Sequence, residues 1–212
     1  MVSLLDHLAR SKVVAILRAE RADAFGDVTD ALVAEGIRAV EFTLTGEGVF
    51  EAIEAYARCL PANVLLGAGT VLSTNDARRA IDLGASFLVT PVVLPDVIEV
   101  GTERGVPVVA GALTPTEVHL AHSAGASLVK IFPAALGGPS YLRQLREPLP
   151  AARLVPTGGV GIDNATEYLA AGAFAVGLGG QLIGDALRGG SLAELRTRAE
   201  RLRSLVDAAV AA

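Results

Sequence analysis

Short apolar runs alternate along the chain with longer stretches in which apolar residues recur at helical spacing. The runs are rich in Val, Ile and Leu and are apolar on both faces, which is typical of parallel strands buried on both sides. We expect strands at residues 13–17, 39–44, 64–71, 87–91, 107–113, 128–133, 153–156 and 175–178. Helical patterns lie between them, for example at residues 24–35, 49–60, 75–83 and 164–171.

Several predicted helices end on a glycine just before the next strand, where a left-handed conformation closes the helix. The spacing of these glycines fits roughly two, one, one and two lengths of one repeat, which makes eight strand–helix units. The set is Gly36, Gly84, Gly105, Gly125 and Gly172. Eight such units in 212 residues predict an α/β fold, a single (β/α)8 TIM barrel over residues 1–212. An extra N-terminal helix at residues 3–9 is expected to cross its bottom, and an amphipathic helix from 192 to about 211 to pack outside.

Composition narrows the possible partners and compartments. A net charge of -5 argues against nucleic acid, which requires a basic surface. No segment has 18 consecutive apolar residues and the N-terminus lacks a signal-peptide pattern, so we expect no membrane partner. The single cysteine, Cys59, cannot form an internal disulfide, which favours the cytoplasm; we expect it to be buried or half-buried. His119 and His122 lack an evident third metal ligand and are expected on the surface.

Lys130 is the first candidate for chemistry, because it interrupts the apolar strand at residues 128–133. Active sites of such barrels lie at the carboxyl ends of the strands. Lysine is almost never buried unless it is paired or functional, and burial favours the free amine. A free amine can attack a ketone and form an iminium, the electron sink for carbon–carbon cleavage. The alternative is an outward lysine that extends between helices, and the residue pattern alone does not choose.

Glu41 is a second charge inside an apolar strand, at residues 39–44. A carboxylate there is costly unless it is paired, and it suits a general acid/base. The alternatives are a structural ion pair with Lys130 or an outward side chain. Two charges in two buried strands favour chemistry over chance.

Glycine-rich segments follow three of the predicted strands. Thr157-Gly158-Gly159 and Gly179-Gly180 leave bare backbone N–H groups near strands 7 and 8, where barrels commonly bind phosphate. Gly67-Ala68-Gly69-Thr70 ends strand 3 with little side chain. It indicates either room for a substrate whose carboxylate binds Thr70, or only a tight turn.

The chain resembles the 2-keto-3-deoxy-6-phosphogluconate (KDPG)/4-hydroxy-2-oxoglutarate (KHG) aldolases from about residue 11 to 185. The similar segments are VVAILR (13–18), VEFTL (40–44), GAGTV (67–71), TPTE (114–117), KIFPA (130–134) and PTGGV (156–160). The resemblance implies a class I aldolase of carbohydrate metabolism, as in the Entner–Doudoroff route, built as a homotrimer of (β/α)8 barrels with no metal and no cofactor. Its substrate would be a small 2-keto acid: a phosphorylated sugar acid, cleaved to pyruvate and glyceraldehyde 3-phosphate, or 4-hydroxy-2-oxoglutarate, cleaved to pyruvate and glyoxylate.

The resemblance also implies roles for individual residues. Lys130 would form the Schiff base and Glu41 would be the general acid/base. Thr70, Pro91 and Phe132 would line the pyruvate pocket, and the Gly158-Gly159 and Gly179-Gly180 pairs would hold phosphate, with Thr157 beside them.

One departure from the family pattern concerns the carboxylate of the substrate. Thr45 stands where well-known members carry an arginine, and Arg18 could supply that cation. The segments of strands 2 and 8 are similar to members that act on the phosphogalactonate epimer. Two alternatives to the aldolase remain at this point: another phosphate-binding barrel enzyme, an isomerase or transferase with Glu41 as base, and a barrel that only binds a ligand.

Overall fold

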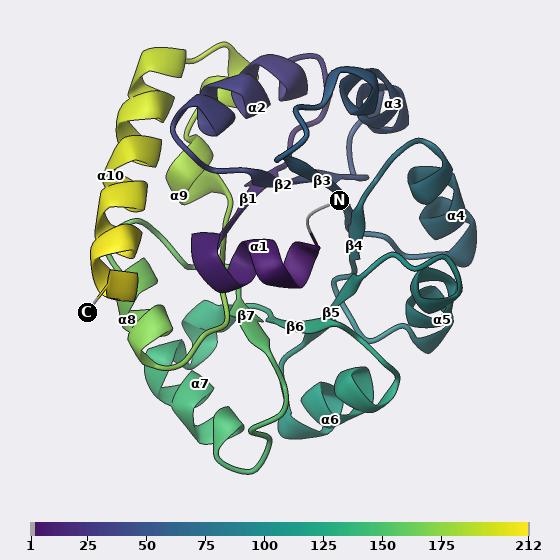
Figure 1. Ribbon diagram of the computed structural model, residues 1–212, viewed down its shortest axis with the longest axis vertical. Coiled ribbons are helices and arrows are strands. Elements are labelled where there is room, and N and C mark those ends of the chain that lie inside the picture. The colour runs from purple at the N-terminus through teal and green to yellow at the C-terminus, as the bar shows by residue number, and fades with distance from the viewer. Residues whose placement is uncertain (1–2, 212) are drawn as a thin grey trace.

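The computed structural model describes residues 3–211 and is a (β/α)8 TIM barrel with an additional N-terminal helix. Its strands form one parallel ring in the order β7-β6-β5-β4-β3-β2-β1-β8 (Figure 1). A parallel bridge between Thr157 and Gly177 joins β7 to β8. The strands are β1 (Val13–Leu17), β2 (Ala39–Thr43), β3 (Leu65–Gly69), β4 (Phe87–Val89), β5 (Val108–Ala112), β6 (Leu128–Ile131), β7 (Leu154–Pro156) and β8 (Val176–Leu178).

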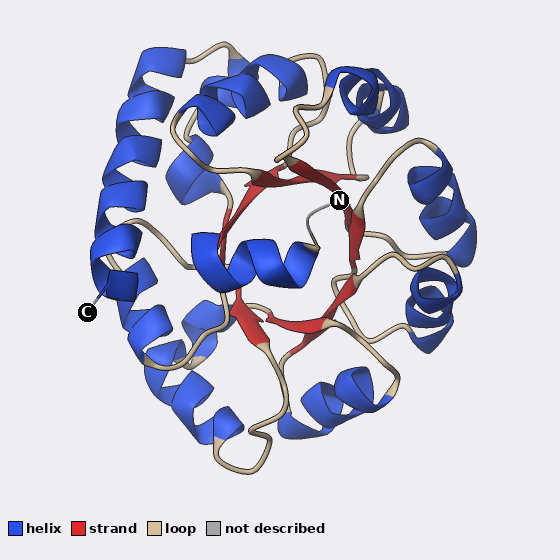
Figure 2. Cartoon of the chain, viewed as in Figure 1, coloured by secondary structure: helices blue, strands red, loops and turns tan. Residues whose placement is uncertain are grey.

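Helices surround this ring, as Figure 2 shows. The outer helices are α2 (Phe25–Ala34), α3 (Val49–Cys59), α4 (Thr74–Asp82), α5 (Pro95–Glu103), α6 (Pro115–Ser123), α7 (Gly138–Arg146), α8 (Ala165–Ala170) and α10 (Leu192–Ala211). Short helical segments lie in the loops after β6 and β8: η1 (Ala134–Leu136), α9 (Gly180–Ile183) and η2 (Ala186–Arg188). The N-terminal helix α1 (Leu4–Ser11) crosses one end of the barrel, as predicted (Figure 1).

The glycines that were expected to end helices do so. All five have positive φ angles, between 65° and 106°, a conformation that side chains with a Cβ rarely adopt. Each lies just beyond the end of an outer helix, so the chain reverses there and enters the next strand. The strand–helix repeat predicted from the spacing of these glycines therefore reflects a real feature: each glycine ends one helix of the barrel.

Two separate sets of apolar residues form the core. Side chains that point into the barrel pack against Leu4 and Leu8 of α1, which fill the bottom of the barrel. The inward set includes Val14, Phe87, Val89, Val109, Leu128 and Val155. Side chains that point outward, such as Val129 and Ile131 of β6, pack under the helices. Because successive side chains of a strand alternate between faces, Leu128 and Lys130 both point inward.

Several predicted strands extended too far at their carboxyl ends. β4 ends at Val89 and β6 at Ile131. Thr90 and Phe132 each keep one backbone hydrogen bond to β5, to the carbonyls of Val109 and Ala112, and the chain then turns into the loops of the barrel mouth. Cys59 was predicted to be buried or half-buried, and this was wrong: it is exposed at the last turn of α3. Within residues 3–211, no helix is long and apolar enough to cross a membrane.

Candidate active site

Lys130 and Glu41 meet inside the barrel, although 88 positions separate them in the chain. Lys130 lies on β6 and Glu41 on β2, and the ring order places three strands between these two. The Lys130 Nζ atom is 4.0 Å from Glu41 Oε1, and their side chains are 7% and 2% exposed. This distance is too long for a direct hydrogen bond. The two groups are therefore electrostatic partners, each with hydrogen-bonding capacity left for a third group.

Glu41 Oε1 is buried and has no hydrogen-bond partner among the described residues. An unsatisfied buried oxygen is costly, so a polar group that enters the site gains by pairing with it. Gly69 makes room for this side chain, since a Cβ on Gly69 would lie 1.9 Å from Glu41 Oε1. A Cβ on Gly67 would lie 2.2 Å from the ring of Phe87. The small residues of β3 therefore leave space for Glu41 and Phe87, and that space is not free for a substrate.

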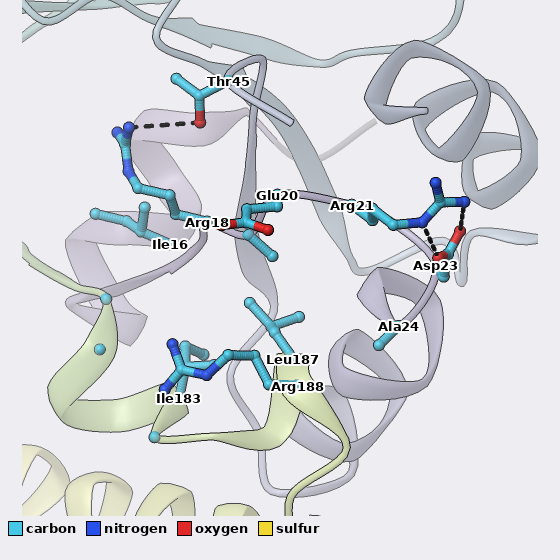
Figure 3. A pocket seen from close by; sticks show the side chains of 14 residues that line it. Ile16, Arg18, Glu20, Arg21, Asp23, Ala24, Thr45, Ile183, Leu187 and Arg188 are labelled. Atoms are coloured by element: carbon cyan, nitrogen blue, oxygen red, sulfur yellow. Dashed lines mark hydrogen bonds and ion pairs between the residues drawn. The ribbon is translucent and has the colours of Figure 1, made fainter. Parts of the chain in front are cut away.

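Arg18 extends from the end of β1 over the barrel mouth. Its guanidinium donates to the Thr70 hydroxyl at 3.0 Å. It also approaches the Thr45 hydroxyl at 3.5 Å, the contact drawn in Figure 3. Both partners are neutral, so the charge of Arg18 has no carboxylate partner within the described chain. Thr70 has a φ of 57°, which is strained for a β-branched residue and is found mostly where function requires it.

The ends of β4 and β5 bring Pro91 to the site. A Cβ on Gly111 would lie 2.2 Å from the backbone of Pro91, so only glycine lets the β4 loop pass this close over β5. The Thr90 hydroxyl fixes the same loop, because it accepts from the Gly111 N–H at 3.3 Å and donates to the Val92 carbonyl at 2.7 Å. These contacts hold Pro91 at the rim.

Gly158 and Gly159 form the loop after β7, with φ angles of 81° and 84°. A Cβ on Gly158 would lie 2.9 Å from the ring of Phe132, the residue just after the end of β6. The Lys130 ammonium lies 5.5 Å from the centre of that ring. Thr157 is buried, and its hydroxyl donates to the Val155 carbonyl at 3.3 Å.

A pocket of about 360 Å³ opens at this end of the barrel. Its lining contains Lys130 and all nine predicted substrate-binding residues: Arg18, Thr70, Pro91, Phe132, Thr157, Gly158, Gly159, Gly179 and Gly180. Glu41 lies beneath its floor, beside Lys130 and Thr157. The sequence analysis missed Ile16, Val160 and Gln181. Gln181 could have been noticed, because it is the first polar side chain after the Gly179-Gly180 pair.

The segment 114–117 proves to be a helix start. Thr114 and Glu117 form a capping box at the N-terminus of α6. The Thr114 and Leu113 N–H groups donate to the Glu117 carboxylate and lower its pKa. Glu117 therefore positions the loop after β5 and does not line the pocket.

Among residues 3–211, no three His, Cys, Asp or Glu side chains are grouped so that they could hold a metal ion. His119 and His122 are exposed on α6, as expected. The chemistry that the pocket itself offers is a buried amine, a buried carboxylate, an exposed guanidinium and two glycine loops.

A protein family and a curated relative match nearly the whole chain. The family described as KDPG and KHG aldolase matches residues 4–197. The probable 2-dehydro-3-deoxy-6-phosphogalactonate aldolase of Rhizobium meliloti is 36% identical over 197 residues, which is 92% of each chain.

Two solved structures are also similar over nearly the whole chain. One, described as native KDPGal, has 30% identity and a TM-score of 0.87, covering 94% of this chain and 96% of its own. The other is the KDPG aldolase of Legionella pneumophila, with pyruvate captured as a covalent carbinolamine intermediate. It has 25% identity and a TM-score of 0.81, covering 97% of both chains.

Proposed function

The chain belongs to the KDPG and KHG aldolase family, and we propose that Lys130 is the residue that performs its class I chemistry. The enzyme is a carbon–carbon lyase. It cleaves a 2-keto-3-deoxy-6-phospho-sugar acid to pyruvate and glyceraldehyde 3-phosphate, 4-hydroxy-2-oxoglutarate to pyruvate and glyoxylate, or both. The observation that supports Lys130 is its position on the pocket floor, 4.0 Å from the Glu41 carboxylate and almost fully buried.

The proposed cycle uses the amine and the carboxylate in turn. Lys130 Nζ adds to the C2 ketone, and loss of water gives an iminium. Glu41 accepts the proton of the C4 hydroxyl, directly or through one water, and the C3–C4 electron pair moves into the iminium. The aldehyde leaves and the enamine of pyruvate remains. Protonation at C3 and hydrolysis release pyruvate and return the free amine.

Borohydride trapping tests this assignment. Incubation with pyruvate and sodium borohydride should add one reduced pyruvate to the peptide that contains Lys130. Lys12 is the only other lysine of the chain and provides the internal control, because its peptide should gain nothing. Full activity in a preparation that traps no pyruvate would exclude the Schiff-base route.

We propose that Arg18 binds the substrate carboxylate. It is a cation without an acidic partner at the pocket rim, and it takes the role that Thr45 cannot perform. Replacing Arg18 by glutamine should raise KM about tenfold to a hundredfold, with a smaller change in kcat, because the lost interaction is made in the ground state as well. Arg18→Lys should recover part of the loss.

Steady-state kinetics with pyruvate release coupled to lactate dehydrogenase measures this split. Arg21→Gln is the matched control, since Arg21 lies nearby but is engaged by Asp23 and Glu47. If Arg18→Gln and Arg21→Gln behave alike, Arg18 has no role in carboxylate binding.

We further propose that the enzyme is a homotrimer of the cytoplasm. Several large apolar side chains are exposed on the loops after β3, β4 and β6: Leu72 at 58%, Val92 at 51% and Leu136 at 73%. Exposed apolar residues on one face of a molecule are typical of an interface. The exposed thiol of Cys59 suits a reducing compartment.

Light scattering should therefore give three times the mass of one chain. Leu136→Glu should lower that mass, while Leu205→Glu, at an exposed position on the outer helix α10, should not. A wild-type mass of one chain at micromolar concentration contradicts the trimer.

A further inference from the structure

A second cavity, of about 990 Å³, adjoins the catalytic pocket. Four residues line both cavities: Ile16, Arg18, Gly179 and Gly180. The outer walls come from the loop after β1 and from the segment of α9 and η2 (Figure 3). A substrate whose far end lies against Gly179 and Gly180 therefore borders the second cavity.

The proposed reaction leaves one charge of the substrate without a counter-ion. A phosphate monoester carries about -1.5 to -2 charges at neutral pH. Among residues 3–211, Arg18 and Lys130 are the only cationic side chains that line the catalytic pocket. Lys130 is committed to the bond with C2, and Arg18 to the carboxylate. The N–H groups of the glycine loops offer partial charges but no net charge.

The second cavity contains a cation that is free to take this role. Its arginines are Arg18, Arg21 and Arg188. Arg21 is paired with Asp23 at 2.8 Å and with Glu47 at 3.1 Å. The Arg188 side chain has no ion pair or hydrogen bond within residues 3–211. In Figure 3 its guanidinium extends toward Ile183, away from Asp23.

The backbone beneath Arg188 is firmly held, while its side chain is not. The Asp185 carbonyl accepts from the Arg188 N–H at 2.7 Å and from the Gly190 N–H at 3.0 Å. Arg198 of α10 donates to the carbonyls of Leu182 and Ile183, at 2.8 and 3.0 Å, which fixes the end of α9. The guanidinium of Arg188 is thus unpaired, while the backbone that carries it is held by hydrogen bonds. A binding group whose position matters requires such a support.

We propose that Arg188 binds the distal anionic group of the substrate and so sets the preference for phosphorylated over unphosphorylated 2-keto-3-deoxy sugar acids. The phosphate lies against Gly179 and Gly180, and Arg188 approaches it from the second cavity. This inference rests on the proposed function, because it assumes that pyruvate chemistry occurs at Lys130.

The test compares Arg188→Gln with wild type on one sugar acid in its phosphorylated and unphosphorylated forms. With the phosphorylated form, kcat/KM should fall about tenfold to a hundredfold, mainly through KM, the range of a charge-assisted hydrogen bond. With the unphosphorylated form it should change less than twofold. Arg188→Lys should restore part of the preference. Arg196→Gln, at an exposed position on α10, is the matched control and should change neither value.

Two outcomes overturn the proposal. In the first, Arg188→Gln lowers kcat/KM equally for the phosphorylated and the unphosphorylated substrate. In the second, Arg188→Gln leaves kcat/KM for the phosphorylated substrate unchanged, as Arg196→Gln does. Pyruvate trapping at Lys130, measured on the same preparations, separates this proposal from the proposed function. Trapping should be the same in Arg188→Gln and wild type, because pyruvate carries no phosphate. A wild type that traps nothing refutes the proposed function, whatever the Arg188 variants do.

Discussion

Replacing Lys130 by methionine is expected to lower kcat/KM by about ten-thousand-fold or more, because no other group in the pocket can add to the ketone. Methionine keeps the volume of the side chain inside the barrel, where Lys130 is 6% exposed, so the fold should persist. The measurement is the lactate dehydrogenase-coupled cleavage assay, run with and without EDTA, beside borohydride trapping.

Lys12→Arg is the control for this variant. It removes the other lysine amine but keeps a cation near the ring of Phe174, which the Lys12 ammonium approaches to 5.4 Å. This variant should retain both activity and trapping. Substantial activity in Lys130→Met would mean that the enzyme cleaves its substrate without a Schiff base at this position.

Glu41→Gln should lower kcat about a hundredfold to ten-thousand-fold, the usual contribution of general acid/base catalysis. Glutamine preserves the shape of the carboxylate but cannot accept the C4 proton. Because Lys130 remains, prolonged incubation with pyruvate and borohydride should still label the protein. The pair of readouts separates proton transfer from Schiff-base formation, and complete loss of labelling would assign Glu41 to the addition step instead.

Gly69→Ala should reproduce much of this loss while Glu41 stays in place. The new methyl group would lie 1.9 Å from Glu41 Oε1 and 2.4 Å from its Cδ, so the carboxylate must move. Gly26→Ala in α2 is the matched control, since its Cβ would meet only a Tyr56 ring atom, at 3.8 Å, and alanine favours a helix.

Thermal unfolding of both glycine variants separates loss of activity from loss of fold. If the new methyl group lowers activity by displacing the Glu41 carboxylate, then adding Gly69→Ala to Glu41→Gln should lower kcat little further. Fully additive losses in the double variant would show that Gly69 matters for another reason.

The barrel itself was predictable because its signals are local. A run of apolar residues forms a strand, and a glycine that must adopt positive φ ends a helix, whatever the rest of the chain does. Gly36 and Gly172 therefore mark the repeat from near one end of the chain to the other. Strand ends were less accurate: the apolar residues after β4 and β6 belong to loops, and hydrophobicity does not distinguish a strand from a packed loop.

The direction of Lys130 was not predictable from its own strand. Residues on both faces of β6 are buried, so its sequence has no polar–apolar alternation to indicate which face looks inward. The same holds for Glu41 on β2. Only closure of the ring, with α1 against the inward face, places the two side chains 4.0 Å apart.

The sequence by itself determined the eight-unit barrel, the family resemblance and most of the residues that line the pocket, because each depends on a short motif or a local periodicity. The tertiary structure alone decided that Glu41 occupies the space left by Gly69, and that Arg18 reaches the hydroxyls of Thr45 and Thr70. It also decided that Arg188 faces a cavity continuous with the site. These contacts join residues far apart in the chain, and their distances depend on how the closed ring packs.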